Sequence, residues 1–158
     1  MRRFLAMSAA ILLLAACETQ TAGTGGARGA GGASYAGAGS TSAQQELGAN
    51  VGDRVFFDLN KHEIRADAQK TLKAQAEWLQ QRSSLNITIE GHCDERGTRE
   101  YNLALGERRA NAVKDYLVAL GVSANRITTI SYGEERPVAL GHNDSAWAQN
   151  RRGVTKVN

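Results

Sequence analysis

Residues 85–121, LNITIEGHCDERGTREYNLALGERRANAVKDYLVALG, contain the unit that decides the fold: a strand, a charged loop and a long helix. The run Ile87-Thr88-Ile89-Glu90 is rich in β-branched residues and alternates apolar with polar side chains, which predicts a strand. After the loop, small and apolar residues recur at alternating steps of three and four, which predicts an amphipathic helix that ends at Gly121. The recurring positions are Leu103, Gly106, Ala110, Val113, Leu117 and Leu120.

Strand and helix patterns on both sides of this unit complete a single domain. Upstream, residues 54–59 predict a strand, and apolar side chains spaced three and four residues apart from Ile64 to Leu79 predict a helix. Downstream, Ile127–Tyr132 predicts a strand, residues 145–148 one helical turn, and Gly153–Val157 the last strand. The order βαβαββ predicts an α+β fold with a mixed sheet and with the helices packed on one of its faces.

The first 16 residues are typical of a secretory signal peptide. Arg2 and Arg3 precede an apolar run from Phe4 to Ala16, which as a helix would be about 20 Å long, too short for a hydrocarbon core of about 30 Å. The sequence Leu14-Ala15-Ala16-Cys17 resembles a lipobox; the alternative is an ordinary cleaved signal that ends beside a chance cysteine. We predict a lipid on Cys17, whose acyl chains would form a stable membrane anchor.

Residues 17–50 are expected to form a flexible tether between the lipid and the domain. Glycine, alanine, serine and threonine dominate from Glu18 to about Ser42, and such a segment cannot bury enough apolar surface to offset its ordering entropy. We therefore place the folded domain at residues 51–158. With Cys17 lipidated, Cys93 has no disulfide partner, and burial as a small apolar side chain is its expected state.

The charge balance argues against a nucleic-acid-binding protein. The formal net charge of the 158 residues is +3, and it falls to about +1 when Arg2 and Arg3 leave with the signal peptide. Nucleic-acid-binding proteins need a broad positive field, which this composition does not supply.

The loop between the central strand and the long helix, GHCDERGTREYN at residues 91–102, concentrates charged side chains. Loops at the ends of sheet strands are common places for ligand-binding groups. Asp94 stands where the strand ends and Arg109 lies two turns into the helix, so the loop could bring one negative and one positive group together. Taken alone, such a pair is more often a structural salt bridge than a ligand site.

The motifs of this region resemble the OmpA-like peptidoglycan-binding domain family, most closely its lipoprotein branch. They are Gly91-His92-Cys93-Asp94-Glu95-Arg96-Gly97-Thr98, Tyr101 to Ala110, Ser131 to Pro137 and Asn150-Arg151-Arg152. The resemblance covers residues 51–157 and implies that the ligand is the diaminopimelate of the peptidoglycan stem peptide, bound by Asp94 and Arg109. By looser analogy it implies pocket walls at Phe57, Asp58, Gly97, Thr98, Asn102, Leu105 and Arg152.

The implied ligand suits the two central side chains. Diaminopimelate outside a crosslink offers an ammonium group, which Asp94 can bind, and a carboxylate, which Arg109 can grip with its planar fork of donors. Backbone N–H groups at the helix start, around Gly97 and Thr98, could also receive the carboxylate. One residue of the pair Arg151 and Arg152 is expected to be structural.

The resemblance also implies an outer-membrane lipoprotein that faces the periplasm and works with TolB and other Tol-system proteins in envelope integrity and in outer-membrane constriction at division. Glu18, in place of aspartate after the lipid-bearing cysteine, favours the outer membrane as well. Neither catalysis nor a cofactor is expected. Two alternatives remain: a purely protein-binding role, and a metal site at His92, Cys93 and Asp94, which the alternation of side chains along a strand disfavours.

Overall fold

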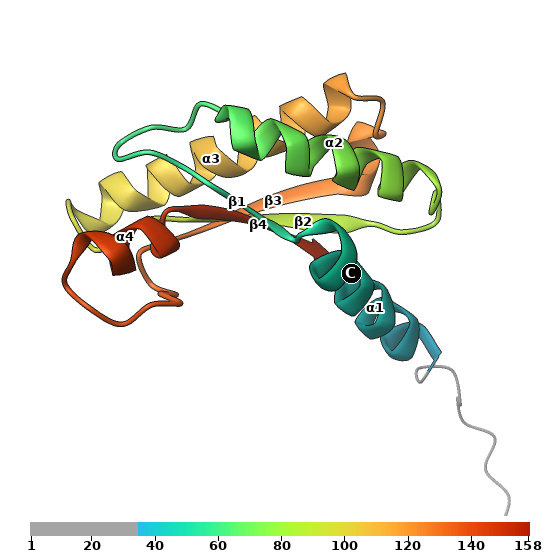
Figure 1. The fold of residues 1–158 in the computed structure, drawn as a ribbon, viewed down its shortest axis with the longest axis horizontal. Helices are drawn as coiled ribbons and strands as arrows, with labels where there is room; N and C mark the ends of the chain where they lie inside the picture. Colours follow the sequence, from blue (N-terminus) through green and yellow to red (C-terminus); the bar gives the residue numbers. More distant parts are fainter. Residues whose placement is uncertain (1–34) are drawn as a thin grey trace, which may run out of the picture. The chain divides into compact units, whose positions relative to one another are not determined.

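The computed structural model describes residues 35–158, with side chains from residue 39 onward. The predicted signal peptide, the lipidation at Cys17 and the first part of the tether therefore lie outside the described residues. Figure 1 shows the elements. They are α1 (Tyr35–Glu46), a π-helical turn (Leu47–Val51), β1 (Arg54–Phe56), α2 (Ala66–Gln80), β2 (Ile87–His92), α3 (Arg99–Ala119), a 3-10 turn (Ala124–Arg126), β3 (Ile127–Gly133), α4 (Asp144–Asn150) and β4 (Arg152–Val157).

A four-stranded mixed sheet forms the centre of the domain, in the order β1-β4-β2-β3. β2 runs parallel to β3, whereas β4 pairs antiparallel with both β1 and β2. α2 and α3 lie together on one side of this sheet (Figure 1). The predicted α+β class, the mixed sheet and the helices on one face are confirmed.

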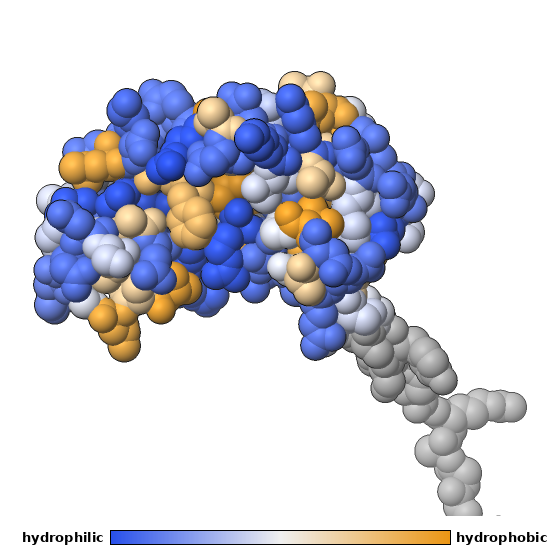
Figure 2. Space-filling view, in the orientation of Figure 1, coloured by the Kyte–Doolittle hydropathy of each residue, from blue (hydrophilic) through white to orange (hydrophobic). Residues whose placement is uncertain are grey.

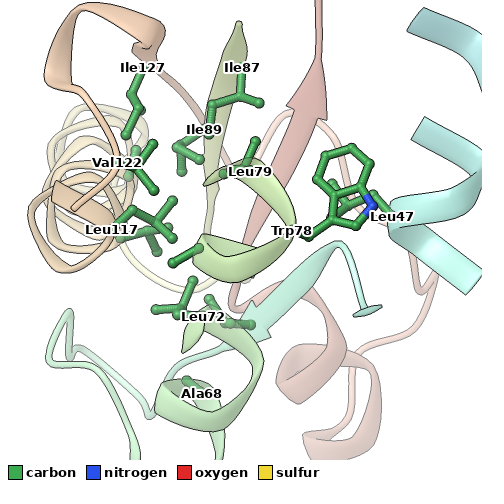
Figure 3. Packing of buried hydrophobic residues seen from close by; sticks show 14 of the residues in the cluster. Leu47, Ala68, Leu72, Trp78, Leu79, Ile87, Ile89, Leu117, Val122 and Ile127 are labelled. Atoms are coloured by element: carbon green, nitrogen blue, oxygen red, sulfur yellow. The ribbon is translucent and has the colours of Figure 1, made fainter. Parts of the chain in front are cut away.

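The hydrophobic core lies between the sheet and these two helices. Ile87 and Ile89 of β2 point into it and meet Leu72 and Leu79 of α2 and Leu117 of α3, all with almost no exposed surface (Figure 3). Burying a side chain of this size contributes roughly 1.5–3 kcal/mol. The alternation in β2 and the spacing of three and four in the helices place these residues, as the sequence predicts.

A close approach of two glycines sets the position of α3 on β2. A Cβ atom added to Gly91 would lie 1.8 Å from the backbone oxygen of Gly106, a distance that no side chain tolerates. The glycine in the apolar stripe of α3 is therefore a contact point with the strand. It fixes the height of α3 on the sheet, and with it the place of Arg109, one turn further on.

The predicted domain boundary at residue 51 is too late. Leu47 is fully buried in the core, and the side-chain amide of Gln44 continues the ladder of β4: its Nε2 donates to Thr155 O (3.4 Å) and its Oε1 accepts from Val157 N (2.8 Å). Glu46 accepts from the Trp78 indole (3.2 Å). Composition missed this segment because three anchoring side chains stand among many small residues.

The helices of residues 35–158 include none whose length and apolar character together would let it cross a membrane.

Candidate functional site

The loop that follows β2 folds tightly between the strand and α3. Cys93 N donates to Gly133 O (2.8 Å), which continues the pairing of β2 with β3 for one residue. Gly97 has a φ of +108°, a conformation that side chains rarely adopt. The hydroxyl of Thr98 then accepts from Tyr101 N (3.2 Å) and caps α3. Gly97 and Thr98 thus shape the loop that presents Asp94.

Arg109 is a buried cation held by backbone oxygen atoms. Only 1% of its surface is exposed, and its guanidinium donates to Lys61 O (2.9 Å), His92 O (2.7 Å) and Asp58 O (3.0 Å). Phe57 lies beneath it, with the guanidinium carbon 5.2 Å from the ring centre. Burial lowers the pKa of Arg109, although an arginine remains protonated in proteins. The group forms no ion pair with a carboxylate among residues 35–158, and one N–H of its Nη2 has no partner there.

Asp94 lies beside Arg109 but pairs with two other arginines. It is 4% exposed. Its Oδ2 accepts from Arg96 Nη2 (2.7 Å) and Arg151 Nη1 (3.1 Å), and its Oδ1 from Arg96 Nε (3.2 Å). Burial raises the pKa of Asp94, but these hydrogen bonds outweigh burial and the net pKa lies below its ordinary value. The carboxylate is therefore ionised at neutral pH.

Both predicted binding residues line one cleft. The direct salt bridge between Asp94 and Arg109, the alternative reading of the sequence, is not among the ion pairs of the described residues. Three arginines against one aspartate leave the cleft with a surplus of positive charge. Its free volume for a water-sized molecule is about 0 Å³, so a side chain must move before a ligand enters. The lining residues are Leu59, Asn60, Cys93, Asp94, Arg96, Asn102, Leu105, Arg109 and Arg151.

Arg96 is the partly exposed member of this set. Its guanidinium covers Asp94 from the outside and lies over the Trp147 ring, 4.0 Å from the ring centre. Its side chain is 33% exposed, against 15% for Arg151, so Arg96 is the arginine that a ligand displaces from Asp94 most readily.

The residues expected to form the pocket walls differ in where they lie relative to the cleft. Asn102 and Leu105 line the cleft directly. Asp58 contributes its backbone oxygen to Arg109, while its exposed carboxylate pairs with Arg65 (3.2 Å). Phe57 supports the guanidinium of Arg109 from below.

Arg152 is not a wall of this cleft, and its inclusion in the expected pocket is wrong. It is 4% exposed and donates to Arg136 O (3.0 Å) and Asn150 O (3.3 Å). Arg151 occupies the site in its place, with Nε donating to Phe57 O (3.0 Å). Because β4 begins at Arg152 and consecutive strand residues point to opposite faces, a shift of one residue exchanges the two roles.

Sequence reasoning also missed Arg96, Leu59 and Asn60. A signal existed for Asn60: it is an asparagine directly after a predicted strand, and asparagine tolerates a positive φ better than most residues. The structure gives it a φ of 56°. Arg96 was visible as a charged residue of the loop, but its contact with Asp94 depends on the turn at Gly97.

His92 and Cys93 point away from each other. The Cys93 thiol is buried, donates to Asn102 O (3.3 Å) and has a pKa that burial raises above its ordinary value. The His92 ring stacks on Tyr132, with ring centres 5.5 Å apart. Among residues 35–158, no group of three or more side chains suited to a metal ion is present.

Comparison with known proteins places this fold and this loop in a family. A model described as the OmpA family matches residues 56–151, and the chain belongs to that family. Within it the chain is similar to peptidoglycan-associated lipoproteins. It is 60% identical over 123 residues to that of Brucella melitensis, covering 78% of this chain and 73% of the relative. It is 44% identical over 123 residues to that of Haemophilus influenzae, covering 74% and 80%. The resemblance inferred from the loop motifs is confirmed.

Solved structures agree with this assignment. The crystal structure of the peptidoglycan-associated lipoprotein from Burkholderia pseudomallei has a TM-score of 0.66 at 42% identity, over 67% of this chain and 90% of that chain. The C-terminal domain of Helicobacter pylori MotB has a TM-score of 0.63 at 22% identity, over 67% of this chain and 84% of that chain. At that identity the second similarity concerns the fold alone.

Proposed function

We propose that this protein holds peptidoglycan non-covalently, by binding the diaminopimelate of the stem peptide between Asp94 and Arg109. One observation carries the proposal: a buried arginine, which has no carboxylate partner among the described residues, lines the same cleft as a buried, ionised aspartate. The names of its relatives, peptidoglycan-associated lipoproteins, support the choice of wall material as the ligand.

The charges of the cleft suit a ligand that carries both signs. The ligand carboxylate would accept a hydrogen bond from the remaining N–H of Arg109 and lie near Arg151, where positive charge is in surplus. The ligand ammonium would take the place of the Arg96 guanidinium on Asp94. Each hydrogen bond to a charged group contributes roughly 1.5–3 kcal/mol, and the few such bonds described here together correspond to about micromolar, reversible binding.

The remainder of the proposal concerns the position of the protein in the cell. A lipid on Cys17 would fix one end in the outer membrane, with the domain in the periplasm and its cleft on the wall. TolB and other Tol-system proteins are the proposed protein partners, in envelope integrity and in constriction of the outer membrane at division. The family assignment supports these roles, and they reach beyond the described residues.

A catalytic role is not proposed. The hydrogen bonds from Arg96 and Arg151 keep Asp94 ionised, so it cannot act as a general acid at neutral pH. The raised pKa of Cys93 keeps its buried thiol protonated, and the thiolate is the nucleophilic form.

Co-sedimentation of the full chain in detergent with diaminopimelate-type sacculi tests the binding residues. Asp94→Asn keeps the shape but removes the charge, and Arg109→Lys keeps the charge but removes the fork; each should lower the bound fraction at least about tenfold. Arg108→Lys, at an exposed neighbouring position of α3, is the matched control and should bind like wild type. Thermal unfolding confirms that each variant is folded. Undiminished sedimentation of both folded variants would contradict the proposal.

A further inference from the structure

A second cleft, open to solvent, lies at the edge of the sheet beside the cleft of Asp94 and Arg109. Its cavity volume is about 270 Å³, between the end of β1, the start of α2 and the end of α4. Figure 2 shows hydrophobic surface among hydrophilic residues in the part of the molecule where β1 and α4 meet. The residues that the argument uses are Phe56, Phe57, Arg65, Asp67, Gln149 and Arg151. We call this cleft the β1 groove.

We propose that the β1 groove binds a sugar ring of the glycan strand whose stem peptide occupies the neighbouring cleft. This inference rests on the proposed function and adds a second ligand class, a neutral amino sugar, to the site. It follows from an aromatic floor, a polar rim, the charge of the groove and its continuity with the first cleft.

The aromatic floor is the first observation. Phe56, the last residue of β1, is 36% exposed although it is a large apolar side chain, whereas Phe57, which follows it and also lines the groove, is buried (1%). The carbon-bound hydrogens on one face of a pyranose ring are apolar and pack against aromatic rings, which prefer such flat, partly positive partners. An exposed ring in a concave site is therefore suited to a sugar.

The polar rim supplies fixed hydrogen-bonding groups. Arg65 donates from Nε to Asp67 Oδ1 (3.0 Å) and from Nη2 to Asp67 Oδ2 (3.2 Å), so the two planar groups hold each other in a bidentate pair. The amide of Gln149, on the exposed surface of α4, has no side-chain partner among residues 35–158 and offers both a donor and an acceptor. Sugar hydroxyl and acetamido groups require both kinds of partner.

The charge of the groove favours a neutral ligand. Arg65 pairs with Asp67, and both line the groove. Apart from Arg151, which the two clefts share, the charges that line the groove therefore balance each other. The parts of the wall polymer next to diaminopimelate include a charged glutamate carboxylate, whereas the amino sugars of the strand carry no charge there.

Arg151 makes the two clefts continuous. Its guanidinium binds Asp94 through Nη1 and the backbone oxygen of Phe57 through Nε, and it lines both cavities. A ligand held on Asp94 can therefore extend over Arg151 into the groove without leaving the protein surface.

Calorimetry on the full chain in detergent, with two soluble wall fragments, tests the proposal. The fragments are the tripeptide alanyl-γ-glutamyl-diaminopimelate and the same tripeptide attached to its disaccharide. Wild type should bind the disaccharide form about three- to tenfold more tightly than the bare tripeptide, the range that one aromatic contact supplies. Phe56→Ala should reduce this ratio to about one and leave the tripeptide affinity unchanged, which also shows that the variant is folded.

Two further variants control this result. Gln149→Ala, on exposed helix surface, should lower the ratio by part of the same amount. Ile130→Ala removes a comparably exposed apolar side chain (40%) from β3 and should leave both affinities unaltered. A ratio of one in wild type, or an equal loss for both fragments in Phe56→Ala, overturns the sugar subsite. Absence of tripeptide binding by wild type contradicts the proposed function instead and removes this inference with it.

Discussion

Arg109 and Arg152 are two buried arginines with different surroundings. Both are at most 4% exposed, and both donate to backbone oxygen atoms. Arg109 and Asp94 line one cleft, whereas Arg152 acts on His92 through its charge and leaves its Nε without a partner among the described residues. Burial and carbonyl bonding are therefore common to both arginines. Only the shared cleft with an ionised aspartate distinguishes a ligand site from a structural cation.

The largest predicted difference between the two arginines is in stability. Arg109→Met removes the guanidinium hydrogen bonds to three backbone oxygen atoms, of which Asp58 O keeps a second donor in Lys61 N, and should lower the free energy of unfolding by about 4 kcal/mol. Arg152→Met frees fewer carbonyls and also removes an incompletely bonded charge, so its cost should be about 1–2 kcal/mol. Urea denaturation of both variants measures the two values. Equal losses would show that the surroundings do not differ in energy.

The surroundings of Arg152 should also be the more sensitive to acid. Burial, and then the charges of Arg152, Arg136 and Lys156, lower the pKa of His92 from 6.5 to about 3. The folded state therefore holds this ring neutral while the unfolded state takes up a proton below pH 6.5. Stability is full above that pH and falls by about 3 kcal/mol between pH 7 and pH 4.

His92→Phe isolates this contribution, because phenylalanine keeps the stacked ring and cannot titrate. As the pH falls from 7 to 4, the free energy of unfolding measured in urea should decrease more for wild type than for His92→Phe. Parallel pH profiles for the two proteins would be incompatible with a neutral buried His92.

Binding measurements should distinguish the role of Arg151 from that of its neighbour Arg152. Arg151→Gln removes a positive charge from the cleft and should weaken binding to diaminopimelate-type sacculi about tenfold. Arg152→Gln, a chemically identical change one residue away, should leave binding unaltered at a temperature where both are folded. Co-sedimentation at matched protein concentration decides the point, and a larger loss for Arg152→Gln would reverse the assignment.

The smallest predicted effect concerns the helix cap that orders the loop of Asp94. Thr98→Ala removes the oxygen that accepts from Tyr101 N and should cost about 1 kcal/mol of stability. Thr98→Ser retains the cap and should cost less. Thermal unfolding of the two variants compares them directly, and an equal shift would mean that the hydroxyl does not stabilise α3.

Periodicity predicted the parts of the fold whose side chains repeat. The steps of three and four in α3 and the alternation in β2 fix which residues face the core, and Leu117 and Ile89 lie there. The phase at the start of β4 could not be predicted, because a shift of one residue exchanges Arg151 with Arg152. The early start of the domain was missed for a different reason: Gln44 and Leu47 make specific contacts that composition does not register.

The site shows the same division. The motif singled out Asp94 and Arg109, and both line one cleft, with Asn102 and Leu105 beside them. The sequence could not reveal that Asp94 is bonded to Arg96 and Arg151, because these contacts depend on the turn at Gly97 and on the register of β4. Local patterns predict which side chains carry charge, and the tertiary fold decides their partners.

The central claim is that Arg109 recognises the side-chain carboxylate of diaminopimelate. Calorimetry with two tripeptides, identical except that one ends in diaminopimelate and the other in lysine, tests it most directly, since lysine lacks only that carboxylate. The wild-type chain should bind the diaminopimelate peptide at least about tenfold more tightly, the equivalent of one charged hydrogen bond, and Arg109→Lys should reduce this preference. Equal affinity of wild type for the two peptides would contradict the account.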